Sequence, residues 1–265
     1  MKPADYVAAN REGWEEAAPI HRKQNQERLL ASFRVPGYSC LDETETAVLW
    51  RIGLAGKDVA QLCCNNGREI LSVKNLGARR CVGFEQAPGF IEQARELAAA
   101  GNIDCEFLQG DVHAIPRDYD GAFDLVTLTV GVLGWMPDLD AFLAVVARLL
   151  RPGGRIFVYE CHPILDMLEP GKADAPVAWN HSYFKRDPYV DNDGLDYYGG
   201  GGYEAKSLYW FHHKLSDVMM ACARNGLDRL ERFEELPDHI NNSFWNVEKQ
   251  GPRLPMSYTL VMLKA

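Results

Sequence analysis

Long apolar runs and clusters of basic residues are missing from this chain of 265 residues. No stretch of about 18 consecutive apolar residues occurs, so we expect no membrane span. The opening residues, Met1 to Asp5, lack the apolar segment of a secretory signal. Basic residues number 28 against 37 acidic ones, which gives a formal net charge of −9. Because neutralising phosphates takes a basic face, this balance disfavours a nucleic-acid partner.

Cysteine pairs with metal-binding or redox spacing are missing too. The seven cysteines include no Cys-x-x-Cys pair, and most lie in strand or helix patterns, where cysteine packs as a small apolar residue. A reduced, cytoplasmic setting is therefore expected. The run from Asp191 to Gly194 resembles the start of a calcium loop, but Gly202 stands where a bidentate glutamate is needed. Adjacent His212 and His213 should point apart, so we predict no metal site.

Size and composition favour one enzyme domain with an extension rather than two equal domains. A chain in which 47% of the residues are hydrophobic can bury a full core. We expect residues 1–57 to form a helical cap and residues 58–265 to form the main domain. An insert at about 161–210 interrupts that domain, because its Pro, Gly and Asp content favours irregular structure.

The cap is expected to hold three helices. Apolar positions recur at helical spacing over Ala4–Ala18 and Ile20–Phe33, and Pro19 should interrupt them. Asp42 is a good capping residue for a third helix, Glu43–Ile52.

From Asp58 to Glu160 strands and helices alternate, which predicts an α/β fold with a doubly wound parallel sheet and helices on both faces. The strands expected in the main domain are Asp58–Leu62, Arg80–Phe84, Phe123–Thr129, Ile156–Glu160, Leu227–Glu234 and Met256–Lys264. The helices expected there are Arg68–Leu76 and Leu215–Asn225.

The turn between the first strand and its helix is the most informative segment. Strand ends of an open parallel sheet face a crevice, and the amides that begin the next helix favour an anionic ligand group there. Glu85 ends the second strand about 20 residues later, the spacing at which a carboxylate meets a ribose diol. Strand, turn and helix together predict a nucleoside site.

This order of elements resembles the class I methyltransferases that use S-adenosylmethionine. The family's first motif is an acid, a spacer and three alternating glycines, and here Gln61, Cys63, Asn65 and Gly67 hold those positions. Only the last glycine is kept. Cys63 is expected to replace glycine with a negative φ, whereas Asn65 tolerates a left-handed conformation.

Later features match the family in the same order. Glu85, followed by Gln86, matches the ribose-binding acid, and Asp111 with the backbone of Val112 matches the adenine contacts. Thr129 ends the fourth strand, where the family wraps the methionine end of the donor. Taken singly, Asp111 could instead cap a helix and Glu85 could begin one.

The resemblance also covers the Arg-Pro-Gly-Gly-Arg turn at residues 151–155, which precedes the fifth strand. It implies a Rossmann-like, seven-stranded sheet whose last strand is antiparallel, S-adenosylmethionine as cofactor and methyl transfer as the activity. Two alternatives stay open: a protein that binds the donor without turning it over, and an oxidoreductase with a nicotinamide dinucleotide. The second normally needs a G-x-G-x-x-G turn, which is not present here.

The insert carries the prediction about the acceptor. Ten aromatic residues lie between Trp179 and Phe211, and we expect most of them to pack the loop and a few to line a pocket above the strand ends. This favours a small, flat, partly apolar acceptor, bound by a monomer or a homodimer. The predicted acceptor contacts are Tyr183, Tyr203, His181 and Trp210.

Methyl transfer to an oxygen or nitrogen that carries a proton benefits from a base with a pKa near neutral. His162 is the predicted base, because Glu160-Cys161-His162-Pro163 ends the fifth strand, near the expected position of the reactive methyl group. His181 and His212 flank the aromatic insert and are held as alternatives.

Overall fold

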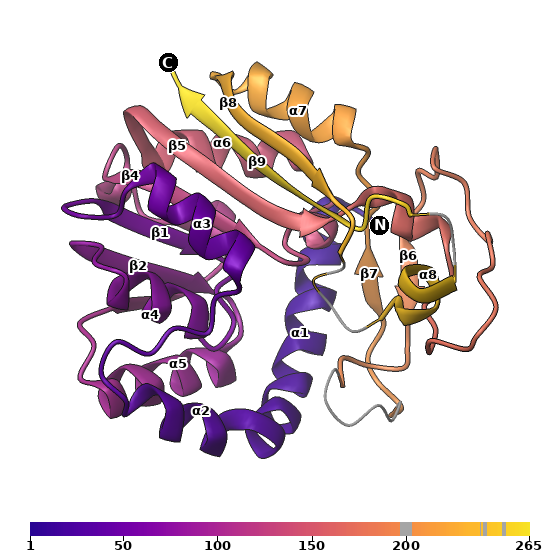
Figure 1. Cartoon of the computed structure of the whole chain (residues 1–265), viewed down its shortest axis with the longest axis horizontal. Coiled ribbons are helices and arrows are strands. Elements are labelled where there is room, and N and C mark those ends of the chain that lie inside the picture. Colours follow the sequence, from indigo (N-terminus) through magenta and orange to yellow (C-terminus); the bar gives the residue numbers. More distant parts are fainter. Residues whose placement is uncertain (197–202, 239, 241–242, 251–252) are drawn as a thin grey trace.

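The computed structural model in Figure 1 describes residues 1–196, 203–238, 240, 243–250 and 253–265. Tyr197, Tyr198 and Gly202 lie outside the described residues. A seven-stranded sheet with strand order β3-β2-β1-β4-β5-β9-β8 forms the centre of the protein. Its strands are β1 Asp58–Leu62, β2 Arg80–Glu85, β3 Glu106–Gln109, β4 Phe123–Thr129, β5 Leu150–Cys161, β8 Leu227–Leu236 and β9 Ser257–Lys264.

The first five strands are parallel, and β9 lies antiparallel between β5 and β8. The predicted α/β sheet with an antiparallel last strand is therefore confirmed. Strand β5 begins six residues earlier than expected, because residues of the Pro-Gly-Gly turn already belong to the strand; the β4–β5 register is irregular between Phe123 and Leu125.

Helices cover both faces of the sheet, as Figure 1 shows. Neighbouring residues of one strand face opposite layers, so Val59 packs on one side of the sheet and Ala60 on the other. The main helices are α3 Glu43–Ile52, α4 Arg68–Asn75, α5 Pro88–Gly101, α6 Leu139–Leu149, α7 Leu215–Arg224 and α8 Trp245–Gln250. Of the helices in the described part of the chain, none combines the length and the apolar character that crossing a bilayer demands.

The N-terminal segment differs from the prediction at Pro19. Helix α1, Pro3–His21, runs through this proline, and a π-helical turn, Arg22–Gln26, separates it from α2, Glu27–Phe33. A proline inside a helix costs one hydrogen bond, but Ala17 and Ala18 are fully buried in tertiary contacts. Burial of this face offsets the lost bond, so packing overrides the local signal.

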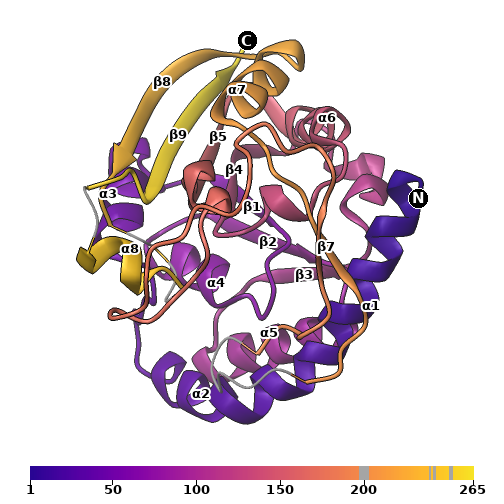
Figure 2. The same cartoon turned by 90° about the vertical axis from the view of Figure 1, so that its right-hand side faces the viewer.

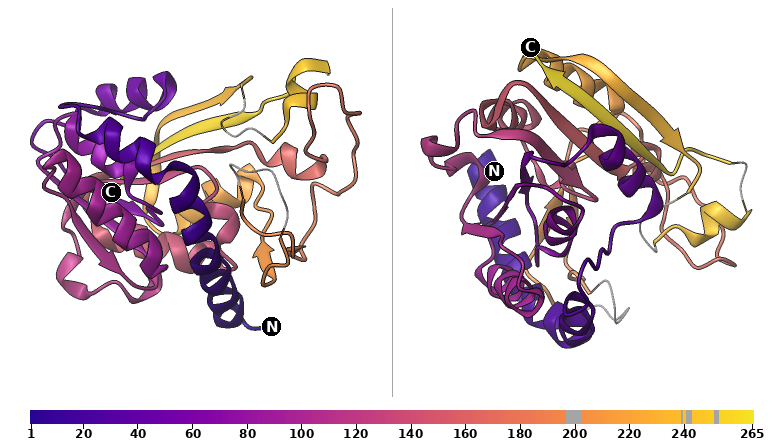
Figure 3. Two further views of the ribbon diagram at one scale, coloured as in Figure 1. Left: turned by 90° about the horizontal axis from the view of Figure 1, so that it is seen from below. Right: turned by 60° about the vertical axis from the view of Figure 1, so that its left-hand side comes forward.

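The cap and the sheet share one core. Phe33 of α2 and Leu49 of α3 belong to the same buried cluster as Ile70 of α4 and Phe157 of β5. Helices α2 and α3 thus pack into the core of the sheet, whereas Ala17 and Ala18 of α1 belong to separate small clusters; Figure 3 shows this segment from two further sides.

The insert contains a small hairpin that the sequence did not predict. Strands β6, Tyr189–Asp191, and β7, Leu208–Trp210, pair antiparallel, and β7 lies beside α1 (Figure 2). The buried side chain of Asn10 explains this position: it donates to the carbonyl of Tyr209 at 2.9 Å and accepts from the amide of Tyr209 at 2.8 Å. The side chain of Asn10 in α1 therefore hydrogen-bonds both backbone groups of Tyr209 at the edge of β7.

Candidate functional site

The turn after β1 has an unusual backbone. Both Cys63, with φ of 55°, and Asn65, with φ of 49°, are left-handed. The expectation for Asn65 is confirmed and that for Cys63 is wrong. The amide of Cys64 donates to the carbonyl of Phe84 at 3.0 Å and its side chain is buried, so the chain has to turn at Cys63 to direct Cys64 inward. The buried neighbour decides the conformation and offsets about 1–2 kcal/mol of strain.

Glu85 is buried at the end of β2 and binds the same turn. Its Oε2 accepts from the amide of Asn65 at 3.0 Å, and its Oε1 accepts from the amides of Gln86 and Ala87 at 2.8 and 2.9 Å. Burial raises the pKa of Glu85, although these three amides lower it. Three of about four acceptor positions of the carboxylate are occupied, so a diol would compete with protein amides for this group.

Asp111 lies on the neighbouring strand end. Its Oδ1 accepts from the amide of His113 at 2.9 Å and caps the short 3-10 helix Val112–Ala114, while the amide of Gly110 donates to the carbonyl of Glu85 at 2.9 Å. Burial, followed by Glu85 and Asp111, raises the pKa of the Cys63 thiol. Both carboxylates therefore interact electrostatically with the same short turn. Asp111 also caps a helix, which is the alternative role considered for it from the sequence.

The carboxylate of Glu69 is a third polar group near this turn, and the sequence pattern did not identify it. Glu69, in the first turn of α4, accepts from the side-chain amide of Gln61 at 2.7 Å and from the hydroxyl of Thr129 at 2.5 Å. Gln61 also donates to Thr129 at 2.8 Å, while its Oε1 is buried without a hydrogen-bond partner. The only sequence signal was an acid in the first turn of a helix, which is usually explained by the helix dipole.

This cluster offers what an ammonium group needs. A buried acceptor without a partner is costly, and Gln61 Oε1 lies beside the carboxylate of Glu69 at the end of β1. Where the resembled family has an acid on the strand, this chain has an amide on the strand and an acid on the helix. These two acceptors therefore fit the methionine end of S-adenosylmethionine, whose ammonium group donates hydrogen bonds.

A small pocket of about 30 Å³ lies beyond the ends of β4 and β5. Its lining combines acids, aromatic rings and one imidazole: Leu133, Gly134, Glu160, Cys161, Pro163, Asp166, Trp210, Phe211, His213 and Tyr258.

Glu160, at the end of β5, connects this strand to the loop after β4 through hydrogen bonds. Its carboxylate accepts from the amide of Gly131 at 2.7 and 2.8 Å, from that of Leu133 at 3.4 Å and from that of Cys161 at 2.8 Å. Burial raises the pKa of Glu160 to about 7, even though these hydrogen bonds lower it. Nothing in the sequence pattern identified Glu160 as a residue of the site.

Trp210 forms the aromatic wall of the pocket. An added Cβ at Gly134 would lie 2.2 Å from the Trp210 ring, so only glycine permits this contact. Trp135 packs edge-on against Trp210, with ring centroids 5.0 Å apart, and against Trp14 of α1 at 5.4 Å. The insert, the loop after β4 and α1 thus meet above the strand ends.

The other three predicted acceptor contacts lie outside the pocket lining. Tyr183 packs edge-on against His212, the hydroxyl of Tyr203 accepts from the amide of Leu195 at 3.5 Å, and His181 pairs with Glu169 at 3.6 Å. The pairing of α1 with β7 places Trp210 at the pocket, a tertiary contact that aromatic density in the sequence does not reveal.

His162 and His213 have different surroundings at the pocket. His162 is buried and caps the 3-10 helix Pro163–Met167: its Nδ1 accepts from the amide of Ile164 at 3.1 Å, and its Nε2 lies 2.9 Å from Glu235. Both of its nitrogens are engaged, and its ring does not line the pocket. His213 does line it and hydrogen-bonds through Nε2 to the carbonyl of Met136 at 2.9 Å.

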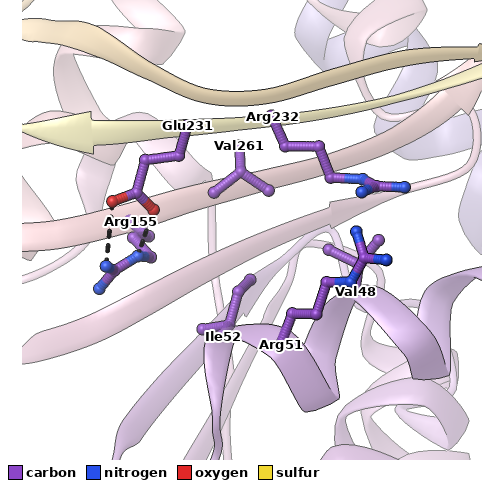
Figure 4. A pocket seen from close by; sticks show the side chains of 7 residues that line it. All are labelled: Val48, Arg51, Ile52, Arg155, Glu231, Arg232 and Val261. Atoms are coloured by element: carbon purple, nitrogen blue, oxygen red, sulfur yellow. Dashed lines mark hydrogen bonds and ion pairs between the residues drawn. The ribbon is translucent and has the colours of Figure 1, made fainter.

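A second pocket, of about 190 Å³, lies on a face of the sheet (Figure 4). Arg155 and Glu231 form a two-point ion pair across it, and the guanidinium groups of Arg51 and Arg232 face each other. Burial, followed by Arg51, lowers the pKa of Arg232. This pocket lies between α3 and the strands β5, β8 and β9, and none of the strand-end residues that carry the predicted chemistry lines it.

Among the described residues, no group of three or more His, Cys, Asp or Glu side chains gathers as a metal site would require. His212 and His213 point to different partners, Asp166 and the Met136 carbonyl, as adjacent residues should.

Comparison with known proteins agrees with this geometry. Residues 59–154 match the family model of a methyltransferase domain. The 2-phytyl-1,4-naphtoquinone methyltransferase of Synechococcus elongatus is 32% identical over 122 residues, which are 44% of this chain and 51% of that protein. The demethylmenaquinone methyltransferase of Thermus thermophilus is 34% identical over 110 residues, 41% of this chain and 49% of that protein. The chain spans about half the length of the curated relatives it matches.

Solved structures share the fold. The S-adenosylmethionine dependent methyltransferase of Mesorhizobium loti aligns with a TM-score of 0.60 and 20% sequence identity over 83% of this chain and 97% of that one. At this identity the likeness shows the architecture, and the chemistry has to be argued from the site.

Proposed function

Because residues 59–154 match the model of a methyltransferase domain, we propose that this chain belongs to the class I S-adenosylmethionine-dependent methyltransferases and transfers a methyl group from S-adenosylmethionine to a small aromatic or heteroaromatic acceptor, at oxygen or nitrogen. When bound, the donor supplies a methyl group on a positively charged sulfur. The protein has to hold donor and acceptor in line and to exclude water.

One observation carries the proposal: the end of β1 presents a buried acceptor, Gln61 Oε1, that nothing in the described structure satisfies. Together with Glu69 it would bind the ammonium group of the donor, and Glu85 and Asp111 would take the ribose and the adenine. The backbone and side chains of the turn and of the neighbouring strand ends complete the proposed donor site, namely Gln61, Cys63, Asn65, Gly67, Glu85, Gln86, Asp111, Val112 and Thr129.

The acceptor class is supported by the pocket beyond β5 and by the relatives. Two of its walls are the aromatic side chains of Trp210 and Phe211, which suit a flat ring. Two curated relatives are named for a naphthoquinone that carries a phytyl chain and for demethylmenaquinone, so the ring of the acceptor is the feature that we take from them. We propose an acceptor of this general kind.

Calorimetric titration tests the donor assignment. The wild-type chain should bind S-adenosylmethionine and S-adenosylhomocysteine and should give no heat with NAD. Glu85→Ala should weaken donor affinity at least tenfold, since that loss corresponds to about 1.4 kcal/mol, less than a buried charged hydrogen bond. Glu92→Ala, which removes an exposed acid of α5, is the matched control and should leave the affinity unchanged.

The outcomes separate the alternatives. Binding of NAD without binding of S-adenosylmethionine would overturn the proposal in favour of an oxidoreductase. Donor binding without turnover across a panel of phenols, aromatic amines and N-heterocycles would favour a protein that binds the donor without using it.

A further inference from the structure

We propose that His213 is the general base of the reaction and that its Nδ1 takes the proton from an uncharged hydroxyl or N–H group of the acceptor, bound in the pocket beyond β5. This inference rests on the proposed function and assigns an acceptor site and a catalytic residue within it. It also replaces His162 in that role, because both nitrogens of His162 are engaged by the protein.

The tautomer of His213 follows from its hydrogen bond. The Met136 carbonyl can only accept, so the Nε2 atom 2.9 Å away has to carry the hydrogen. The neutral ring therefore presents its lone pair on Nδ1, for which the described structure gives no hydrogen-bond partner. His213 lines the pocket, one of its nitrogens is fixed by a carbonyl and the other is unengaged, which is the arrangement that a general base needs.

The charges around the ring suit proton uptake. Burial lowers the pKa of His213 and the neighbouring His212 lowers it further, while the Met136 carbonyl, Asp217 and Asp166 raise it. His213 is thus neutral at pH 7 and able to accept a proton. Once charged, it lies near the two carboxylates of Asp166 and Asp217, which stabilise the imidazolium.

The same pocket selects the acceptor. Asp166 is acidic and Glu160 ionises as pH rises through its raised pKa of about 7. The Cys161 thiol and the Tyr258 hydroxyl beside them stay uncharged, because burial raises the pKa of each well above its ordinary value. This lining disfavours a carboxylate or phosphate near the reacting atom and favours neutral phenols, aromatic amines and N–H heterocycles.

Size limits what the pocket receives in the described conformation. Its volume of about 30 Å³ holds a hydroxyl or amino group but no ring. Admitting the ring requires Trp210 and Phe211 to move. Acceptor binding should therefore change the fluorescence of Trp210.

The acceptor's O–H or N–H bond breaks and its proton moves to Nδ1. The freed electron pair forms the bond to the methyl carbon while the carbon–sulfur bond of the donor breaks and its electrons stay on sulfur. The proton then leaves His213 to water.

Two variants with opposite expectations test the assignment. His213→Gln retains an N–H that can reach the Met136 carbonyl but has no basic nitrogen. It should lower kcat about 10²- to 10³-fold, with donor affinity by calorimetry and acceptor affinity by tryptophan fluorescence changed less than threefold. Glu92→Gln, at an exposed acid of α5 outside both proposed sites, should leave all of these values unchanged.

The pH profile gives a second readout. Because the base must be neutral, kcat of the wild type should rise with pH through the lowered pKa of His213, with an inflection below 6.5. His213→Gln should lose this inflection. A phenol acidic enough to ionise by itself should suffer less from the substitution. A variant that keeps both kcat and the inflection would overturn the proposal.

Nitrogen NMR of the wild-type imidazoles decides the matter independently of turnover. We expect His213 to carry its hydrogen on Nε2 and to titrate below 6.5. A hydrogen on Nδ1 at neutral pH would overturn the assignment even if every acceptor in the panel is inert or the variant fails to fold. Failure of the proposed function would show itself differently, as absence of donor binding by the wild type.

Discussion

Replacing Glu160 with glutamine should remove a specific pH dependence from the stability of this protein. Burial raises the pKa of Glu160 from its ordinary value of 4.5 to about 7. Between these two pH values the folded chain holds a proton that the unfolded chain has released. Unfolding free energy therefore falls as pH rises through this window, the reverse of the effect of a salt-bridged carboxylate whose pKa is lowered.

The magnitude follows from the width of the window. At about 1.4 kcal/mol per pH unit, ionising Glu160 in its buried position costs the folded state about 3 kcal/mol by pH 7 relative to pH 4.5. The hydrogen bonds to Gly131 and Leu133 are strongest when the carboxylate is ionised, and they reduce this cost without cancelling it, since the pKa stays raised.

Urea denaturation at pH 4.5, 5.5 and 7 measures the effect. Other groups titrate over the same range, so the quantity to compare is the difference between wild type and Glu160→Gln at each pH. The glutamine changes stability by an amount independent of pH. The wild type should lose about 3 kcal/mol more than the variant from pH 4.5 to pH 7. Parallel curves for the two proteins would refute the reasoning.

Three further changes test the contacts around the site. Gly134→Ala places a Cβ against the Trp210 ring and should cost about 1–3 kcal/mol, seen as a lower melting temperature and a shifted tryptophan emission; unchanged emission would contradict the contact. Asn10→Ala breaks two hydrogen bonds to the Tyr209 backbone, so it should lower the free energy of unfolding by about 1–3 kcal/mol and speed proteolysis of the β6–β7 hairpin. Equal proteolysis rates for variant and wild type would argue that Asn10 does not hold β7 in place. Arg51→Gln removes a cation facing another guanidinium in the pocket of Figure 4 and should leave the melting temperature equal or higher; a clear drop would mean that the residue has an attractive partner.

Local patterns were sufficient for most of the fold. The strand Asp58–Leu62 and the helix Glu43–Ile52 were predicted at their observed bounds. The first is a short apolar run ended by turn residues, and the second begins at Asp42, whose side chain accepts from the amide of Glu45 at 2.8 Å. Both signals come from residues a few positions apart, so the sequence contains them completely.

The errors came from residues whose behaviour depends on distant partners. Pro19 stays within a helix because α1 is buried against other elements, and Cys63 is left-handed because its neighbour is buried beneath it. His162 and His213 could not be ranked from the sequence. The carbonyl that fixes His213 is 77 residues away along the chain, and the carboxylate that engages His162 is 73 residues away.

The sequence by itself determined the alternation of strands and helices from Asp58 to Glu160 and the spacing of Glu85 and Asp111 along the chain, since periodicity and spacing are local properties. Tertiary structure alone decided which polar atoms of the described residues were left unengaged, among them Gln61 Oε1 and His213 Nδ1. Whether an atom has a partner depends on three-dimensional packing, and these unengaged atoms carry the chemistry proposed for this protein.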